Sequence, residues 1–113
     1  MLDILRKQFL EKQDKVMAII DSYAEKYNLD WPDVCVFGSF ARGEATGSSD
    51  LDIAIIAKKP DPAISGSLRC DAEELNTDIV FITKESFLNG NSLLSRTMRR
   101  DAKFIKGGNW FDK

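Results

Sequence analysis

Two short apolar runs constrain the fold of this chain most. Residues 34–37 read Val-Cys-Val-Phe, and residues 51–57 read Leu-Asp-Ile-Ala-Ile-Ile-Ala. Runs of this length are typical of strands rather than of helices. Because they contain almost no alternating polar residues, they indicate strands that are covered on both faces. The sequence therefore predicts a sheet with helices packed against it.

Helical spacing and further apolar runs supply the remaining elements. Apolar residues recur at steps of three and four along three segments, which predicts amphipathic helices. In chain order we expect a helix over 3–27, strands over 34–37 and 51–57, a helix over 63–76, a strand over 77–82, a helical turn over 83–87 and a final helix over 93–105, stopped by Gly107-Gly108. This order predicts one α/β (α+β) domain over residues 1–113, with a small mixed β-sheet packed by helices.

The composition excludes several classes of site. The chain has 113 residues and no histidine, and its two cysteines, Cys35 and Cys70, have no metal-ligand spacing. A zinc site of the usual kind, a Ser-His-Asp triad and a Cys-His nucleophile are therefore excluded. No apolar run approaches the ~20 residues of a membrane helix, and the N-terminus lacks the apolar stretch of a secretory signal. We expect a cytoplasmic protein with reduced thiols and no membrane partner.

Charge is distributed unevenly along the chain. The formal net charge is −2, which does not indicate direct DNA binding. Residues 1–83 carry nine Lys/Arg against fifteen Asp/Glu, whereas residues 84–113 carry seven against three. The basic C-terminal segment is either a solvated face or a surface that binds a partner, and the solvated face is the commoner case.

Three aspartates stand in or beside apolar strands, where carboxylates are rare unless their charge is compensated. Asp50 and Asp52 are two residues apart at the start of one predicted strand, so their side chains point to the same face. Asp78 lies near the start of another strand, and the three carboxylates converge if the two strands pair. Mg²⁺ or Mn²⁺, which prefer oxygen ligands, would neutralise them. Taken singly, each aspartate is more simply a strand cap, a solvent-facing residue or a turn residue.

A polar loop follows the first predicted strand and begins with Gly38-Ser39. A glycine lets a phosphate approach the backbone, and the serine hydroxyl and exposed N–H groups can donate hydrogen bonds to phosphate oxygens. Arg42 lies one helical turn after Ser39, a position from which it can pair with a phosphate. Ser49 directly precedes Asp50. By itself such a loop is weak evidence, since small residues are also typical of a flexible turn.

Taken together, the loop and the aspartates resemble a known signature. Gly38-Ser39, then ten residues, then Asp50-x-Asp52 resemble the signature of the nucleotidyltransferase superfamily related to DNA polymerase β. Within that superfamily, this run most resembles the minimal nucleotidyltransferases, the MNT group. Asp78 matches the third carboxylate of the family. The resemblance covers residues 31–106, which we expect to form the catalytic core.

The resemblance implies an activity and a role for each motif residue. Family members transfer a nucleoside monophosphate from a nucleoside triphosphate, here ATP, to an acceptor hydroxyl and release pyrophosphate. It implies that Asp50 and Asp52 bind two Mg²⁺ ions, while Asp78 shares the metal on the acceptor side and helps to deprotonate the attacking hydroxyl. The nucleotide-binding residues that it implies are Gly38, Ser39, Arg42 and Ser49.

The same resemblance suggests an acceptor. MNT proteins are commonly paired with HEPN-domain proteins in toxin–antitoxin systems, in which the MNT antitoxin can transfer AMP to a tyrosine of the HEPN ribonuclease. A chain of this length leaves no room for the acceptor domain of larger relatives, so we expect a HEPN-domain partner. Two alternatives stay open: a non-catalytic antitoxin that acts by contact alone, and transfer to a small molecule. An exposed apolar stripe on the first helix would favour a homo-oligomer.

Overall fold

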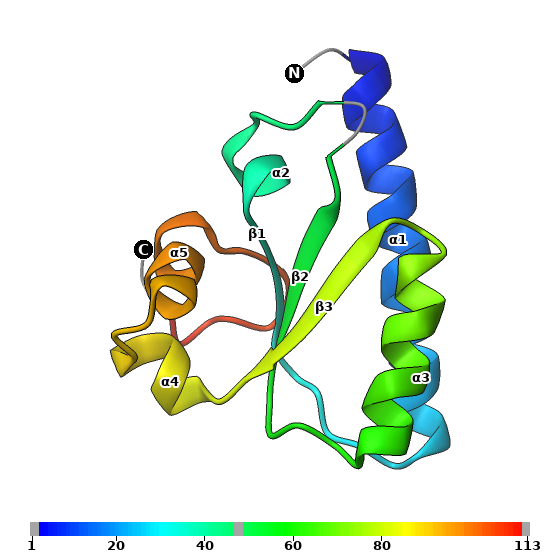
Figure 1. Cartoon of the computed structure of the whole chain (residues 1–113), viewed down its shortest axis with the longest axis vertical. Helices are drawn as coiled ribbons and strands as arrows, with labels where there is room; N and C mark the ends of the chain where they lie inside the picture. The colour runs from blue at the N-terminus through cyan, green and yellow to red at the C-terminus, as the bar shows by residue number, and fades with distance from the viewer. Residues whose placement is uncertain (1–2, 47–48, 112–113) are drawn as a thin grey trace.

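The computed structural model describes residues 3–46 and 49–111 and arranges them as helices around one sheet (Figure 1). The elements are α1 (Asp3–Lys26), β1 (Val34–Phe37), α2 (Ser39–Arg42), β2 (Leu51–Ile56), α3 (Pro62–Glu73), β3 (Thr77–Ile82), α4 (Lys84–Asn89), α5 (Leu93–Asp101) and β4 (Lys103–Lys106). The predicted mixed sheet packed by helices is confirmed. None of the helices in the described ranges is long and apolar enough to cross a membrane.

The sheet has four strands in the order β3-β2-β1-β4. β1 is antiparallel to both β2 and β4, whereas β2 and β3 run parallel. A parallel pair requires a crossover connection, and α3 provides it. Because of this crossover, β2 and β3 both begin at the same end of the sheet.

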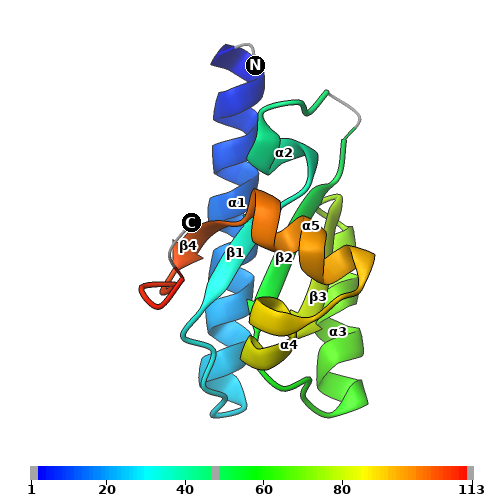
Figure 2. The same ribbon diagram turned by 90° about the vertical axis from the view of Figure 1, so that its left-hand side faces the viewer.

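Helices cover both faces of the sheet, as the continuous apolar runs predict. α1 and α3 lie on one face, and α4 and α5 lie on the other (Figures 1 and 2). Along β2, Ile53 and Ile55 belong to the core under α1 and α3, while Ala54 and Ile56 belong to the core under α4 and α5. Complete burial of an isoleucine or leucine contributes about 1.5–3 kcal/mol. Neither face can therefore be left open without a large loss of stability.

The C-terminal segment differs from its prediction. The helix expected over residues 93–105 ends at Asp101, and Ala102 has an extended backbone with φ −53° and ψ 127°. Residues 103–106 instead form β4 along the open edge of β1. The helical spacing of Ile105 was misleading, because Phe104 and Ile105 point to opposite faces of the sheet and join different cores.

Gly107-Gly108 stops this strand rather than a helix. Both glycines have positive φ, 66° and 81°. A Cβ on Gly108 would lie 2.2 Å from the ring of Phe104, so only glycine fits. The chain then turns back, and the rings of Trp110 and Phe111 pack against Phe87 and Phe104.

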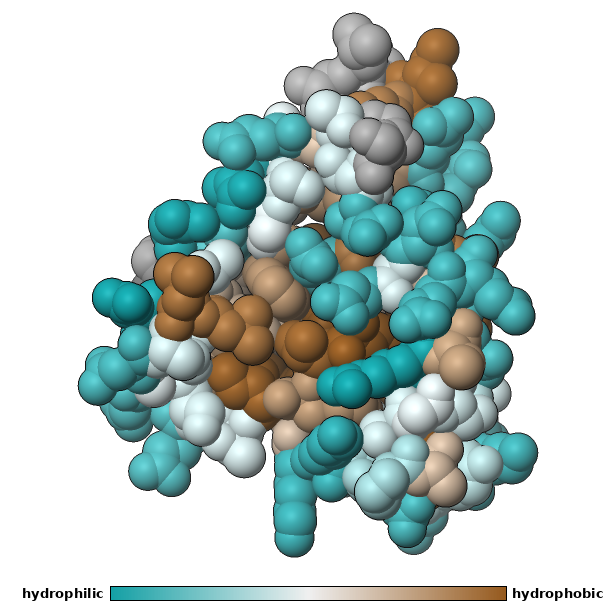
Figure 3. Space-filling view, viewed as in Figure 1, coloured by the Kyte–Doolittle hydropathy of each residue, from teal (hydrophilic) through white to brown (hydrophobic). Residues whose placement is uncertain are grey.

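One group of large apolar side chains is exposed where α4 meets α5. Leu93 is 74% exposed, and Leu88 and Leu94 are also accessible. Figure 3 shows apolar surface over these two helices. On α1, Ile4 and Leu10 are exposed while Val16 and Ile20 are buried, so only part of its apolar surface is covered.

Candidate functional site

The parallel pairing of β2 with β3 brings the predicted aspartates together. Asp52 and Asp78 are direct register partners, and each is the second residue of its strand. Both share a sheet face with the core under α4 and α5, but they lie at the open end of the strands. Asp50 immediately precedes β2. The three residues line one pocket of about 350 Å³.

Burial and mutual repulsion act on Asp52. Its pKa is raised, first by burial and then by the negative charges of Asp78 and Asp50, while Arg42 opposes the shift. Within the described residues, none of the three carboxylates forms a hydrogen bond or an ion pair. Among the described residues, the negative charge of this site is therefore only partly offset, by the nearby Arg42.

The donor set fits a hard divalent cation by its chemistry. Carboxylate oxygens are the ligands that Mg²⁺ and Mn²⁺ prefer, and an ion between Asp52 and Asp78 would remove the repulsion that raises the pKa of Asp52. In the described ranges no three acidic side chains are gathered tightly enough to enclose an ion. The acidic residues thus line an open pocket, and we expect a bound ion to draw their carboxylates closer together.

Glu73 is a further acid on this pocket that sequence reasoning missed. It is the last residue of α3, and the chain re-enters the sheet at Thr77 only a few residues later. The crossover therefore returns this side chain to the starting end of β3. The sequence did contain a signal for Glu73. It is an acid at the end of a predicted crossover helix, a few residues before a strand that carries an aspartate.

The Gly38 backbone directly contacts the acidic site. Because β1 and β2 are antiparallel, the end of β1 meets the start of β2, and Phe37 is the register partner of Asp52. Gly38 has φ 79° and ψ −156°, and a Cβ built on it would lie 2.3 Å from Oδ2 of Asp52. Only glycine allows this approach. The two halves of the sequence motif are therefore in contact.

Ser39 follows as the first residue of α2, a helix of four residues. Among the described residues its hydroxyl has no hydrogen-bond partner. The N–H of Arg42 donates to the carbonyl of Gly38 at 3.1 Å, which closes the turn behind it. The Ser39 hydroxyl is therefore available one residue after the glycine that contacts Asp52, where the sequence predicts a phosphate donor.

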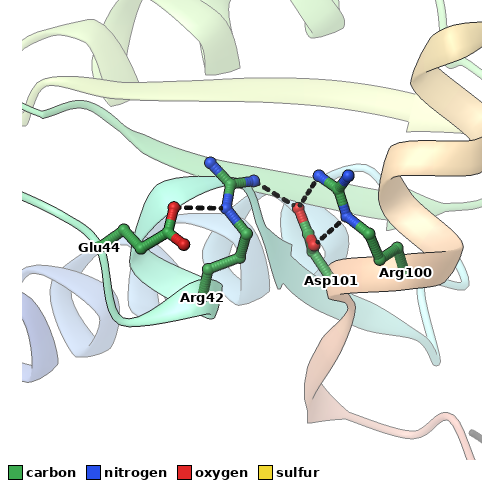
Figure 4. Close-up of polar contacts among 4 residues, drawn as sticks. All are labelled: Arg42, Glu44, Arg100 and Asp101. Atoms are coloured by element: carbon green, nitrogen blue, oxygen red, sulfur yellow. Dashed lines mark hydrogen bonds and ion pairs between the residues drawn. The ribbon is translucent and has the colours of Figure 1, made fainter.

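Arg42 lies near the site but is already paired with acids (Figure 4). Its Nε donates to Glu44 at 3.0 Å and its Nη1 to Asp101 at 2.7 Å. Asp101 also accepts from Arg100 at 2.8 Å, and its side chain is only 2% exposed. The pKa of Asp101 is lowered, chiefly by the hydrogen bond from Arg100 and also by the one from Arg42. Arg42 thus ties α2 to α5, and one guanidinium nitrogen stays unpaired in the described part of the chain.

Sequence reasoning also missed Asp101. The residue follows Met98 by three positions on the buried side of α5. An acid at a buried helix position requires a cation, and Arg42 and Arg100 supply two. The signal in the sequence was the position of this acid on the apolar face of the predicted helix, three residues after Met98.

Ser49 has a local role in the structure. Its hydroxyl accepts a hydrogen bond from the N–H of Thr46 at 2.9 Å, and its own N–H donates to the carbonyl of Thr46 at 3.1 Å. Ser49 closes the turn that leads into Asp50 and does not line the acidic pocket. Its contact with a nucleotide stays a prediction.

Two solved structures are similar to this chain in fold. One is a toxin–antitoxin with AMP-PNP, at 21% sequence identity and a TM-score of 0.56, which covers 82% of this chain and 74% of that one. The other is a candidate nucleotidyltransferase from Sulfolobus solfataricus, at 20% identity and a TM-score of 0.53, which covers 96% of this chain and 87% of that one. No curated protein matches the sequence.

A family comparison agrees with the fold and with the motif. The model of the nucleotidyltransferase domain matches residues 16–103, a span that contains β1, β2, β3 and the loop between the first two. This span includes the glycine–serine loop and all three aspartates of the acidic pocket. The chain belongs to the nucleotidyltransferase domain family.

Proposed function

We propose that this protein is a Mg²⁺-dependent nucleotidyltransferase that transfers AMP from ATP to a hydroxyl on a partner protein. The observation that carries the proposal is the direct pairing of Asp52 with Asp78, beside the glycine that contacts Asp52. Acidic side chains that repel one another in a pocket of about 350 Å³ suit the combination of a divalent cation and a nucleoside triphosphate.

Each residue of the site has a task in this reaction. Asp50, Asp52 and Asp78 hold Mg²⁺, which supplies positive charge for the phosphates and for the leaving group. Asp78, on the edge strand β3, faces the acceptor side and takes the proton of the attacking hydroxyl. The hydroxyl oxygen forms a bond to the α-phosphorus, the bond to the bridging oxygen breaks, and pyrophosphate leaves.

The loop residues bind the remaining phosphates. Gly38 places the backbone of the loop against Asp52, beside the phosphate of a metal-bound nucleotide, and the Ser39 hydroxyl donates to that phosphate. The unpaired nitrogen of Arg42 adds a charged donor, although Glu44 and Asp101 balance much of its charge. We therefore expect Arg42 to contribute less to affinity than a free arginine does. Ser49, which closes the turn before Asp50, is a further candidate donor to the nucleotide.

The acceptor that we propose is a tyrosine of a HEPN-domain toxin. The support comes from the similar structure of a toxin–antitoxin with AMP-PNP, which associates this fold with both a toxin and an adenine nucleotide. In this proposal the protein is the antitoxin, and AMP on the tyrosine silences the toxin. The partner supplies the hydroxyl and the surface that presents it to Asp78.

An antitoxin that acts by contact alone is the second candidate. Its interface would be the basic C-terminal segment. Several basic side chains of this segment are already paired within the chain, which leaves less positive charge for a partner. Arg99 donates to the carbonyl oxygens of Phe87 and Gly90, and Arg100 pairs with Asp101. Arg96 and Lys103 stay outside such pairs in the described residues, while Lys106 pairs with Asp21 at 3.4 Å.

The decisive experiment incubates the protein with its neighbouring-gene HEPN partner, ATP and Mg²⁺, and then measures intact masses. We expect the partner to gain AMP with the natural protein and with Asp30→Asn, a matched control at an exposed aspartate away from the site. Asp52→Asn and Asp78→Asn should abolish the gain. A stable complex without any mass gain would contradict AMP transfer and favour an antitoxin that acts by contact alone.

A further inference from the structure

A second cavity lies on the other side of α2, away from the acidic pocket. It has a volume of about 410 Å³ and is formed between the first half of α1, α2 and β4. Figure 2 shows α2 and β4 beside the upper part of α1. We call it the α1–α2–β4 cavity, and its principal lining residues are Arg6, Phe9, Gln13, Phe40, Lys103 and Ile105.

The charge of this cavity is opposite to that of the acidic pocket. Arg6 and Lys103 line it, and no carboxylate of the described residues does. Within the described residues neither cation takes part in an ion pair. The ammonium of Lys12 lies 5.7 Å from the centre of the Phe40 ring and adds positive charge nearby. In a chain with a net charge of −2, this concentration of unpaired cations favours an anion.

The walls between these cations are aromatic and apolar. The rings of Phe9 and Phe40 are stacked, with centroids 4.6 Å apart and planes at 24°. Ile105 adds an aliphatic surface, and the amide of Gln13 provides a donor and an acceptor. Flat aromatic walls bind flat apolar groups, and the cations at the rim bind a negative group on the same molecule.

The cavity is separate from the proposed reaction. None of its lining residues lines the acidic pocket. Phe40 belongs to the core under α1 and α3, whereas Asp52 and Asp78 lie on the sheet face of the opposite core. An anion without a divalent cation is repelled by the aspartates, so its favoured location is the α1–α2–β4 cavity.

We propose that the α1–α2–β4 cavity binds a small organic anion that carries an aromatic ring. Its volume lies within the range of about 300–1,000 Å³ that is usual for small-molecule sites. The aromatic ring stacks against Phe9, and the anionic group pairs with Arg6 and Lys103. The proposal does not depend on nucleotidyl transfer.

The test uses two dyes of the same ring system. 1-Anilinonaphthalene-8-sulfonate is anionic, and N-phenyl-1-naphthylamine is its uncharged counterpart. We expect the anionic dye to bind more tightly, and we expect Arg6→Gln and Lys103→Gln each to weaken it about two- to fivefold, the effect of one partly solvated charge pair. Lys59→Gln removes an equal charge from an exposed position outside the cavity and should leave affinity unchanged. Fluorescence titration measures each dissociation constant.

Amide chemical shifts of the unmutated protein locate the dye independently of any variant. We expect the largest shifts at Gln13 and Ile105. Shifts centred on Leu88, Leu93 and Leu94 would overturn the proposal, because the dye would then report the exposed patch of α4 and α5. Absence of binding to the folded protein, equal binding of the uncharged dye, or indifference to both cavity substitutions would overturn it as well.

Discussion

The backbone of Gly38 and the carboxylate of Asp52 share a space that admits no side chain. A Cβ on Gly38 would lie 2.3 Å from Oδ2 of Asp52. Gly43 provides a comparison, because its φ of 75° is also positive but no atom of the described residues lies within 4 Å of its Cβ position. Comparing alanine at the two positions therefore shows what the contact with Asp52 and the ψ of −156° at Gly38 together add to the cost of a positive φ.

We expect Gly38→Ala to abolish AMP transfer and to destabilise the protein by more than about 1–2 kcal/mol, the cost of placing a side chain in a left-handed conformation. Gly43→Ala should incur only that cost and keep its activity. Urea denaturation and the transfer assay measure the two effects. Full activity of Gly38→Ala would show that the contact with Asp52 has no part in the reaction.

Asp101 is a buried carboxylate that pairs with two partly exposed arginines, and its removal should lower the stability of the fold. We expect Asp101→Asn to lower the free energy of unfolding by about 1–3 kcal/mol, because the arginines lose a charged acceptor. The pKa of Asp101 is lowered from the usual 3.8. Its stabilising contribution is therefore complete above this value and is lost as the pH falls through the lower folded-state pKa.

Urea denaturation between pH 2 and pH 6 tests this pH dependence. The natural protein should lose more stability than Asp101→Asn as the pH falls below about 4. Glu44→Gln is the control, since it removes the exposed acid that also pairs with Arg42 and should have a small effect. Parallel pH curves for the natural protein and Asp101→Asn would exclude the network as a source of stability.

β4 is held by its pairing with β1 and by the aromatic rings around it. Its residue Phe104 packs against Phe87, Trp110 and Phe111, with ring centroids 6.1, 5.7 and 5.9 Å away. We expect Phe104→Ala to lower the free energy of unfolding by about 2–4 kcal/mol, somewhat less than for a fully buried ring. Leu93→Ala, at a 74% exposed side chain, should change it by less than about 0.5 kcal/mol.

Urea denaturation followed by tryptophan fluorescence measures both variants, since Trp110 lies in this ring cluster. The indole of Trp110 should also become more accessible to a quencher in Phe104→Ala. If Phe104→Ala were as stable as Leu93→Ala, the residues after α5 would not pack against the sheet in solution.

At the scale of the whole molecule, negative charge gathers at one end of the sheet, and Arg42 offsets only part of it. The pKa of Asp52 is raised above the usual 3.8. Its contribution to stability is therefore favourable at low pH and is lost as the pH rises through the folded-state value. At neutral pH without a divalent cation, the ionised carboxylate destabilises the fold.

We expect Asp52→Asn to be more stable than the natural protein at pH 7 in the presence of EDTA. Added Mg²⁺ should reverse the order, because an ion at 100 times its dissociation constant adds about 2.7 kcal/mol to the natural protein only. Thermal unfolding with EDTA or Mg²⁺ measures this, with Asp30→Asn expected to behave as the natural protein. If Mg²⁺ raised the unfolding temperature of Asp52→Asn as much as that of the natural protein, the ion would bind at another site.

Sequence alone determined the local structure and the motif of this protein. The apolar runs gave β1 and β2 because continuous apolar residues of strand length require burial on both faces. Helical periodicity gave most of α1 and α3. The spacing from Gly38-Ser39 to Asp50 and Asp52 indicated the nucleotidyltransferase family before any contact was known. These properties depend on residues close together in the chain.

Only the tertiary structure decided which distant residues meet. Asp78 lies beside Asp52 because β3 pairs with β2 in parallel and in that register. Asp101 holds Arg42 because α5 ends against α2. Residues 103–106 became a strand because the edge of β1 offers unpaired backbone groups, and hydrogen bonds to that edge outweigh a weak helical pattern. Which strands pair, and which segment occupies the open edge of β1, depend on contacts between residues that are far apart in the chain.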